Sequence, residues 1–106
     1  MNSPAPTSYV ILTDKPGLFH TEIGADMRAL ERYDYVFHGR TRAHFVIAAL
    51  ERETRITIID DGQPRTVSQV PSKLLKKYAS LTEARRDLDQ LLNSELPGAR
   101  LLRVEL

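Results

Sequence analysis

The spacing of apolar residues changes once along this 106-residue chain, and that change limits the available folds more than any other feature. Up to about residue 70, apolar side chains mostly recur at every second position, as Tyr33, Tyr35 and Phe37 do. This is the period of a strand with one buried face. From Leu81 onwards they recur at helical spacing. The pattern predicts an α+β fold in which strands come first and a helix covers them.

Individual strands are predicted where β-branched and aromatic residues lie between turn signals. One segment, 43–51, also contains the helix formers Ala, Leu and Glu, but the short polar break before the next apolar run favours a hairpin. The last strand is predicted from the alternation of Leu102, Val104 and Leu106 with charged residues. The predicted strands are 8–13, 18–23, 28–38, 43–51, 55–60, 65–70 and 99–106.

An amphipathic helix is predicted over 81–94. Ser80 and Glu83 have the spacing of a capping box, which marks the start of a helix. The apolar residues that share one face of this helix are Leu81, Ala84, Leu88, Leu91 and Leu92. We therefore expect the helix to bury this face against the strands.

The fold class that follows is a mostly antiparallel β-meander of about five to seven strands, packed by one C-terminal amphipathic helix. Whether the meander closes into a barrel is left open by the sequence. Residues 1–7, with Pro4 and Pro6 among small polar residues, are predicted to be a flexible lead-in. Residues 8–106 have the length of a single α+β domain.

Composition removes several classes of function. The chain has no cysteine, which excludes disulfides, thiolate-bound zinc and cysteine nucleophiles. Its 15 basic and 14 acidic residues leave a net charge of +1, which argues against a dedicated nucleic-acid binder. Apolar runs stay well below the roughly 18 residues of a membrane span, and the N-terminus lacks a signal-peptide pattern. We expect a cytoplasmic protein without a membrane partner.

The stretch 38–45, HGRTRAHF, carries the sharpest chemical idea in the sequence. If Thr41 is the centre of a hairpin, His38 lies opposite His44. If the next hairpin turns within 51–54, His44 lies opposite Asp61 in the same way. The assumed registers thus place two imidazoles and one carboxylate in a single row.

Two interpretations of this row remain open. His38, His44 and Asp61 are ligand types of a non-haem iron or catalytic zinc site, and His20 with Glu22 could add a second pair. However, opposed strands would separate His38 from Asp61 by about 10 Å, which strains coordination of one ion. The alternative is a solvated polar rim that binds no metal.

Basic residues gather at the predicted hairpin ends. Arg40, Arg42 and Arg65 could together bind an anion or an acidic partner. The alternative is that they keep the sheet edges soluble and prevent edge-to-edge pairing.

The leading functional hypothesis is a small non-catalytic accessory subunit that binds another protein, or itself, through a sheet face or edge. Its positive support is a second sheet face that is unusually apolar and would need a cover, formed by Val36, Val46, Ala48 and Ile59. The sequence shows no recognisable catalytic or cofactor-binding motif, so no catalytic residue and no cofactor is predicted. One alternative is a small metal-dependent or ligand-binding β-barrel enzyme that uses His38, His44 and Asp61. The other is a nucleic-acid-binding module that uses the basic hairpin ends.

Overall fold

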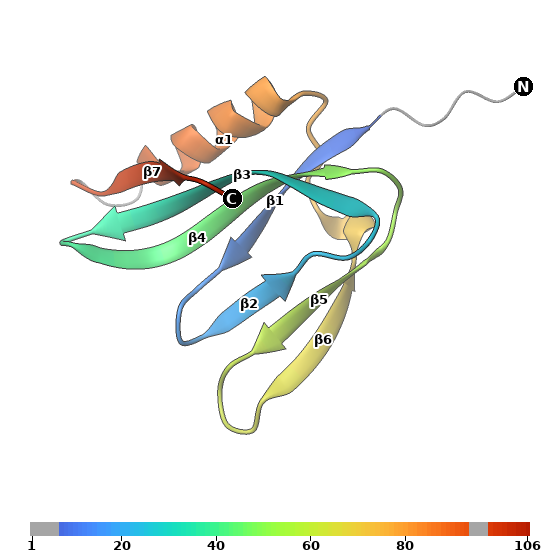
Figure 1. The fold of residues 1–106 in the computed structure, drawn as a ribbon, viewed down its shortest axis with the longest axis horizontal. Helices are drawn as coiled ribbons and strands as arrows, with labels where there is room; N and C mark the ends of the chain where they lie inside the picture. Colours follow the sequence, from blue (N-terminus) through green and yellow to red (C-terminus); the bar gives the residue numbers. More distant parts are fainter. Residues whose placement is uncertain (1–6, 94–97) are drawn as a thin grey trace, which may run out of the picture.

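The computed structural model describes residues 7–93 and 98–106, in which the strands form two antiparallel sheets accompanied by one α-helix (Figure 1). This confirms the predicted α+β class. Residues 1–6 of the predicted lead-in, and residue 94 of the predicted helix, lie outside the described residues. The elements are β1 (Ser8–Asp14), β2 (Phe19–Glu22), β3 (Met27–Phe37), β4 (Arg40–Leu50), β5 (Arg55–Asp60), β6 (Thr66–Pro71), the short 3₁₀ helix η1 (Ser72–Leu74), α1 (Leu81–Asn93) and β7 (Arg100–Val104).

The strands do not follow the simple meander order that the sequence suggested. The four-stranded sheet has the order β1-β4-β3-β7, and the three-stranded sheet has the order β2-β5-β6. The predicted pairing of β4 with β5 is wrong, because β1 and β3 occupy both edges of β4. The link 51–54 instead carries the chain into the second sheet, where β5 pairs with β2 and β6. The two sheets do not close into a barrel.

Both faces of the four-stranded sheet are covered, one by α1 and the other by the three-stranded sheet (Figure 1). On the helix side, Ala84 and Leu88 of α1 pack against Tyr35, Ala43, Phe45 and Ile47. On the opposite side, the buried residues are Val10, Leu12, Met27, Ala48, Leu50 and Ile56. The four-stranded sheet is therefore the middle layer of the molecule.

The turn between β3 and β4 sets the register of the longest strand pair. Phe37 pairs with Arg40, so His38 and Gly39 are the two central residues, with φ values of 51° and 70°. Two positive φ values are typical of a type I′ turn, whose twist matches that of a hairpin. The predicted centre at Thr41 is therefore wrong.

An irregularity near the start of β3 decides which side chains face the helix. The pairing with β4 shifts between Ala29 and Glu31, so Leu30 is an extra residue in the strand. Before this bulge, Met27 packs into the cluster beneath the second sheet. After it, Glu31 points to the opposite side and contacts α1. The bulge thus turns a charged side chain toward the helix.

The predicted capping box marks the start of α1. The backbone N–H of Glu83 donates to Ser80 Oγ over 3.1 Å, and the Glu83 carboxylate accepts from the backbone N–H of Ala79 over 3.0 Å. The predicted burial of Ala84 and Leu88 is confirmed, whereas the side chains of Leu91 and Leu92 lie outside the description. In the described part of the chain, no helix has the length and apolar character needed to cross a membrane.

Candidate functional site

The predicted row of His38, His44 and Asp61 does not form. His44 pairs with Asp34 on β3, and His38 lies in the turn with its ring 4.1 Å from that of Phe37. Asp61 follows β5, which belongs to the other sheet. The prediction failed because both assumed hairpin registers were wrong. Within residues 7–93 and 98–106, no three His, Cys, Asp or Glu side chains form a group that could hold a metal ion.

Two of the three histidines pair with carboxylates other than those predicted. His44 Nδ1 lies 2.6 Å from an oxygen of Asp34, its cross-strand neighbour. His20 Nδ1 lies 3.1 Å from an oxygen of Asp61, so the β1–β2 hairpin is joined to the end of β5. The His44–Asp34 pair joins two strands of one sheet. The His20–Asp61 pair joins β2 to the loop that follows β5. Both pairs therefore have a structural role.

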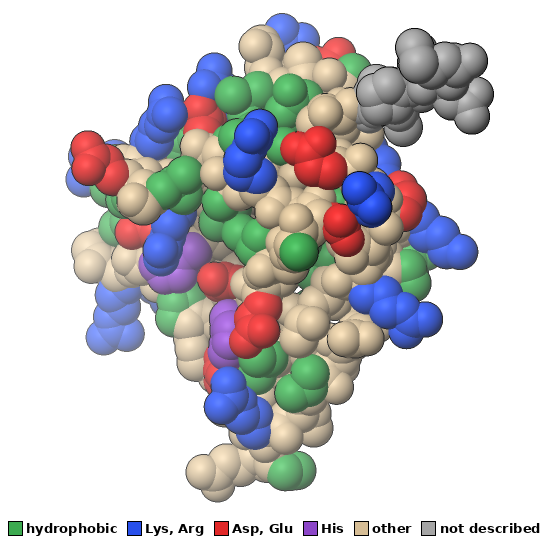
Figure 2. Space-filling view, turned by 45° about the vertical axis from the view of Figure 1, so that its right-hand side comes forward, with side chains coloured by type: hydrophobic (Ala, Val, Ile, Leu, Met, Phe, Trp, Pro, Cys, Tyr) green, Lys and Arg blue, Asp and Glu red, His purple; other side chains and the backbone are tan. Residues whose placement is uncertain are grey.

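The three arginines predicted as a joint anion site do not lie together. Arg40 and Arg42 are exposed beside the β3–β4 turn, where the Arg42 guanidinium lies 5.7 Å from the centre of the Phe37 ring. Arg65 precedes β6, and Figure 1 places the β5–β6 turn at a different corner of the molecule. On the face shown in Figure 2, basic and acidic side chains lie interspersed. These three arginines therefore do not form one basic patch.

The apolar face predicted as an interface is mostly covered by the chain itself. Ala48 is fully buried and Val46 packs on the same cluster, beneath the three-stranded sheet. Ile59 is buried within that sheet, whereas Val36 is half-buried near the hairpin end. The second sheet of the same chain covers Val46 and Ala48. Ala48 and Ile59 therefore cannot line an exposed interface.

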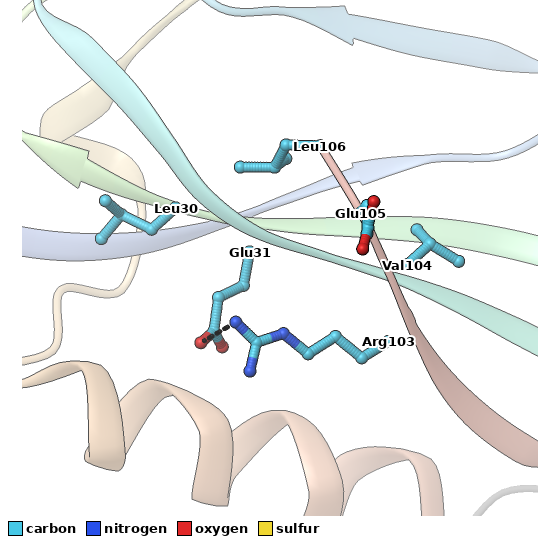
Figure 3. A pocket seen from close by; sticks show the side chains of 6 residues that line it. All are labelled: Leu30, Glu31, Arg103, Val104, Glu105 and Leu106. Carbon is cyan, nitrogen blue, oxygen red and sulfur yellow. Dashed lines mark ion pairs between the residues drawn. The ribbon is translucent and has the colours of Figure 1, made fainter.

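A buried ion-pair cluster, which sequence reasoning missed, lies between β3, β7 and α1 (Figure 3). The Glu31 side chain is only 2% exposed. Arg85 Nε donates to Glu31 Oε1 over 2.8 Å, and a second Arg85 nitrogen contacts Oε2. Arg103 lies 3.1 Å from Oε2, and the Tyr33 hydroxyl donates to Oε1 over 2.7 Å. These partners anchor the carboxylate in its ionised form.

The electrostatics of this cluster follow from its contacts. The hydrogen bond from Arg85 outweighs the opposing effect of burial and lowers the pKa of Glu31 to about 2. Burial, followed by the hydrogen bond to Glu31, raises the pKa of Tyr33. A hollow of about 480 Å³ adjoins the cluster, but both carboxylate oxygens already have partners inside the protein. We therefore assign Glu31 a structural role.

The sequence did carry a signal for this cluster. Glu31 shares the two-residue alternation of Tyr33 and Tyr35, so it occupies a position on the buried face. A charged residue at such a position indicates a buried ion pair, because an unpaired buried charge is very costly. The partner, Arg85, could not be found from spacing alone.

Strand β6 offers a different kind of site, an open sheet edge. One edge of β6 pairs with β5, and the other has no partner strand among the described residues. Residues 66–69 are all exposed, and Val67 is 64% exposed. The run from Thr66 to Val70 contains neither a charged residue nor a proline. Such an edge presents outward N–H and C=O groups that can pair with another chain.

The three other sheet edges are protected. Along β1, Tyr9 exchanges two backbone hydrogen bonds with Tyr78, of 3.0 and 2.8 Å. The edge strand β2 has only four residues, and its Thr21 N–H donates to Asp14 over 2.7 Å. The edge strand β7 has five residues, of which Arg100 and Arg103 are charged. Short strands, charges and covering segments are the usual ways in which proteins block edge pairing.

An open hollow of about 610 Å³ lies at the Pro71 end of β6. Its wall is braced by Glu53, which accepts a hydrogen bond from the Ser72 hydroxyl and lies 3.0 Å from Lys77. The Ser72 hydrogen bond, followed by that of Lys77, lowers the pKa of Glu53. The residues that line this hollow are Glu53, Thr54, Arg55, Gln69, Pro71, Ser72 and Lys73. Two exposed cations, Arg55 and Lys73, therefore flank the end of the open edge.

Comparisons with models of protein families, with curated proteins and with solved structures found no match to this chain.

Proposed function

We propose that this chain is a small non-catalytic interaction module that pairs the open edge of β6 with an extended segment of another polypeptide. The observation that carries the proposal is the contrast between edges. β6 is exposed from Thr66 to Gln69 and uncharged from Thr66 to Val70, whereas the other three edges of the two sheets are short, charged or covered. Natural sheets generally protect such an edge, and an unprotected one is suited to strand addition.

The side chains of β6 would give this pairing its specificity. Backbone hydrogen bonds supply affinity in strand addition, while alternate side chains select the partner. Val67 lies opposite Ile59 and Gln69 opposite Thr57, so the outer face offers one apolar and one polar contact. An uncharged partner strand with an alternating apolar and polar pattern fits this edge.

Site-specific cross-linking tests the proposal. A photoreactive amino acid placed at Gln69, which is exposed on β6, should capture a discrete polypeptide in cells of the native host. The same amino acid at Leu102, which is 43% exposed on the protected edge strand β7, is the matched control and should not capture it. No product from position 69, or the same products from both positions, would contradict the proposal.

A further inference from the structure

We infer that a slot between strand β1 and the three-stranded sheet binds a small, neutral molecule that is mainly apolar and carries one hydrogen-bonding group. The slot has a volume of about 170 Å³. It lies against the inner face of the three-stranded sheet, whereas the proposed strand pairing uses the free edge of β6. The inference therefore goes beyond the proposed function and does not depend on it.

The walls of the slot are apolar because β5 and β6 direct alternate side chains toward it. Ile56 lies opposite Val70, and Ile58 lies two residues further along β5, so these three side chains share one face of the sheet. Ile56 belongs to the same buried cluster as Leu12 of β1, so this face points toward the middle sheet. Leu75, which follows η1, also lines the slot.

The slot offers little to water. Among the described residues, no charged side chain lines it. One of its two threonines, Thr21, already donates its hydroxyl to the Thr13 carbonyl over 2.8 Å and its N–H to Asp14 over 2.7 Å. An apolar cavity of about 150 Å³ stays dry and can bind a molecule as large as benzene. The slot in this chain therefore suits an apolar molecule of that size.

Ile11 contributes its backbone to the slot. Its side chain packs on the helix side of the middle sheet, so the backbone is the part that faces the slot. Two residues before it, Tyr9 exchanges two backbone hydrogen bonds with Tyr78 across the outer edge of β1. Two residues after it, the Thr13 carbonyl accepts from the Thr21 hydroxyl at the same edge. Because alternate residues of an antiparallel strand direct their backbone groups to the same edge, the N–H and C=O of Ile11 also point outward there.

These two backbone groups have no hydrogen-bond partner among the residues that the structure describes. Unpaired backbone groups shielded from water are costly, so a ligand that pairs with both gains from each. A carboxamide fits, because its C=O can accept from the Ile11 N–H and its N–H can donate to the Ile11 C=O. An anion does not fit, because the described lining holds no cation and the Asp14 carboxylate lies beside Thr21.

Titration of the full chain with benzamide, followed by NMR, tests the site. Saturable shifts should appear for the Ile11 amide and for the methyl groups of Ile58, Val70 and Leu75. The dissociation constant should be on the order of 1 mM for a molecule this small. Benzoate has the same shape but is anionic at neutral pH, so it should bind at least about tenfold more weakly.

The same substitution on the two faces of β6 locates the site. Val70→Phe fills the slot and should weaken benzamide binding at least about tenfold. Val67→Phe is the matched control, because Val67 is 64% exposed on the other face of the strand, and it should bind benzamide as the native chain does. Thermal unfolding shows whether both variants fold. If Val70→Phe does not fold, NOEs from the benzamide ring to the methyl groups of Ile58 and Leu75 in the native chain decide instead.

Any one of three results would overturn the inference. One is the absence of a saturable shift up to about 10 mM benzamide. Another is equal binding of benzamide and benzoate. The third is native affinity in a folded Val70→Phe chain, or NOEs only to residues away from the slot. Because none of these results involves capture from Gln69, the proposed function stands or falls separately.

Discussion

Glu31 on β3 and Arg85 on α1, separated by 54 positions in the sequence, form a two-point ion pair where the helix meets the sheet. Arg103 of β7 reaches the same carboxylate. The helix, the longest hairpin and the last strand therefore share one buried charge. This cluster fixes the layer that covers the helix side of the middle sheet.

Arg85→Met should lower the free energy of unfolding by about 2 kcal/mol, because it leaves the buried Glu31 carboxylate with fewer partners. Arg103 and Tyr33 remain as partners, which keeps the loss moderate. The neighbouring Arg86→Met is the control and should change stability by less than about 0.5 kcal/mol, because Arg86 is exposed. Chemical denaturation measures the free energy of unfolding of both variants. Equal decreases for the two would show that the Glu31–Arg85 ion pair makes no specific contribution to stability.

The low pKa of Glu31 predicts a contribution to acid sensitivity. Its partners in the folded chain lower the pKa of the Glu31 carboxyl from its ordinary value of 4.5 to about 2. A lowered folded pKa gives stability that is fully present above about pH 4.5 and is lost as the pH falls toward 2. Denaturation midpoints measured through this window should fall less steeply for Glu31→Gln than for the native chain. If the midpoints of both proteins fall equally with pH, the low pKa of Glu31 in the folded chain is contradicted.

Leu88 is among the largest fully buried side chains, with 1% exposure, and packs from α1 against the middle sheet. Leu88→Ala should cost roughly 2–5 kcal/mol, through lost burial and the cavity left behind. Leu102→Ala removes the same atoms from a residue that is 43% exposed and should cost less than about 1 kcal/mol. A Leu88→Ala loss as small as that of Leu102→Ala would mean that the helix is not packed as described.

The β3–β4 turn can be tested through its glycine. Gly39 has a φ of 70°, a conformation that alanine adopts only with strain, so Gly39→Ala should destabilise the chain by about 1 kcal/mol. Gly24→Ala is the control, because Gly24 has no positive φ and its added methyl group would meet nothing within 4 Å. Thermal unfolding that shows equal midpoints for the two variants would argue against the type I′ turn.

The elements of this fold could be predicted from the sequence, because their signals are local. The segment 55–60 matches β5, and the helix beginning at Leu81 follows its capping residues. The strand order could not be predicted in the same way. β2 pairs with β5 across about 40 positions, with Thr21 opposite Ile58, and no local pattern distinguishes that pairing from a simple hairpin.

The sites were harder to predict because they depend on register. The prediction centred the turn on Thr41 instead of on His38 and Gly39. It therefore placed His44 in a row of metal ligands, whereas the observed register places it opposite Asp34. The open edge of β6 was equally hidden. The sequence shows that this segment is uncharged. Its position at the edge of a sheet follows only from the full strand order.

Hydrogen exchange of the backbone amides in β6 tests the central claim most directly. The measurement compares the dilute chain with the complex identified by cross-linking from Gln69, or with the concentrated chain if that partner is a second copy. Pairing at the edge predicts that alternate amides between Thr66 and Val70 become protected in the complex, because their outward N–H groups gain partners. The amides of β7 should exchange equally in both states. Unchanged exchange in β6 with new protection elsewhere would contradict the claim.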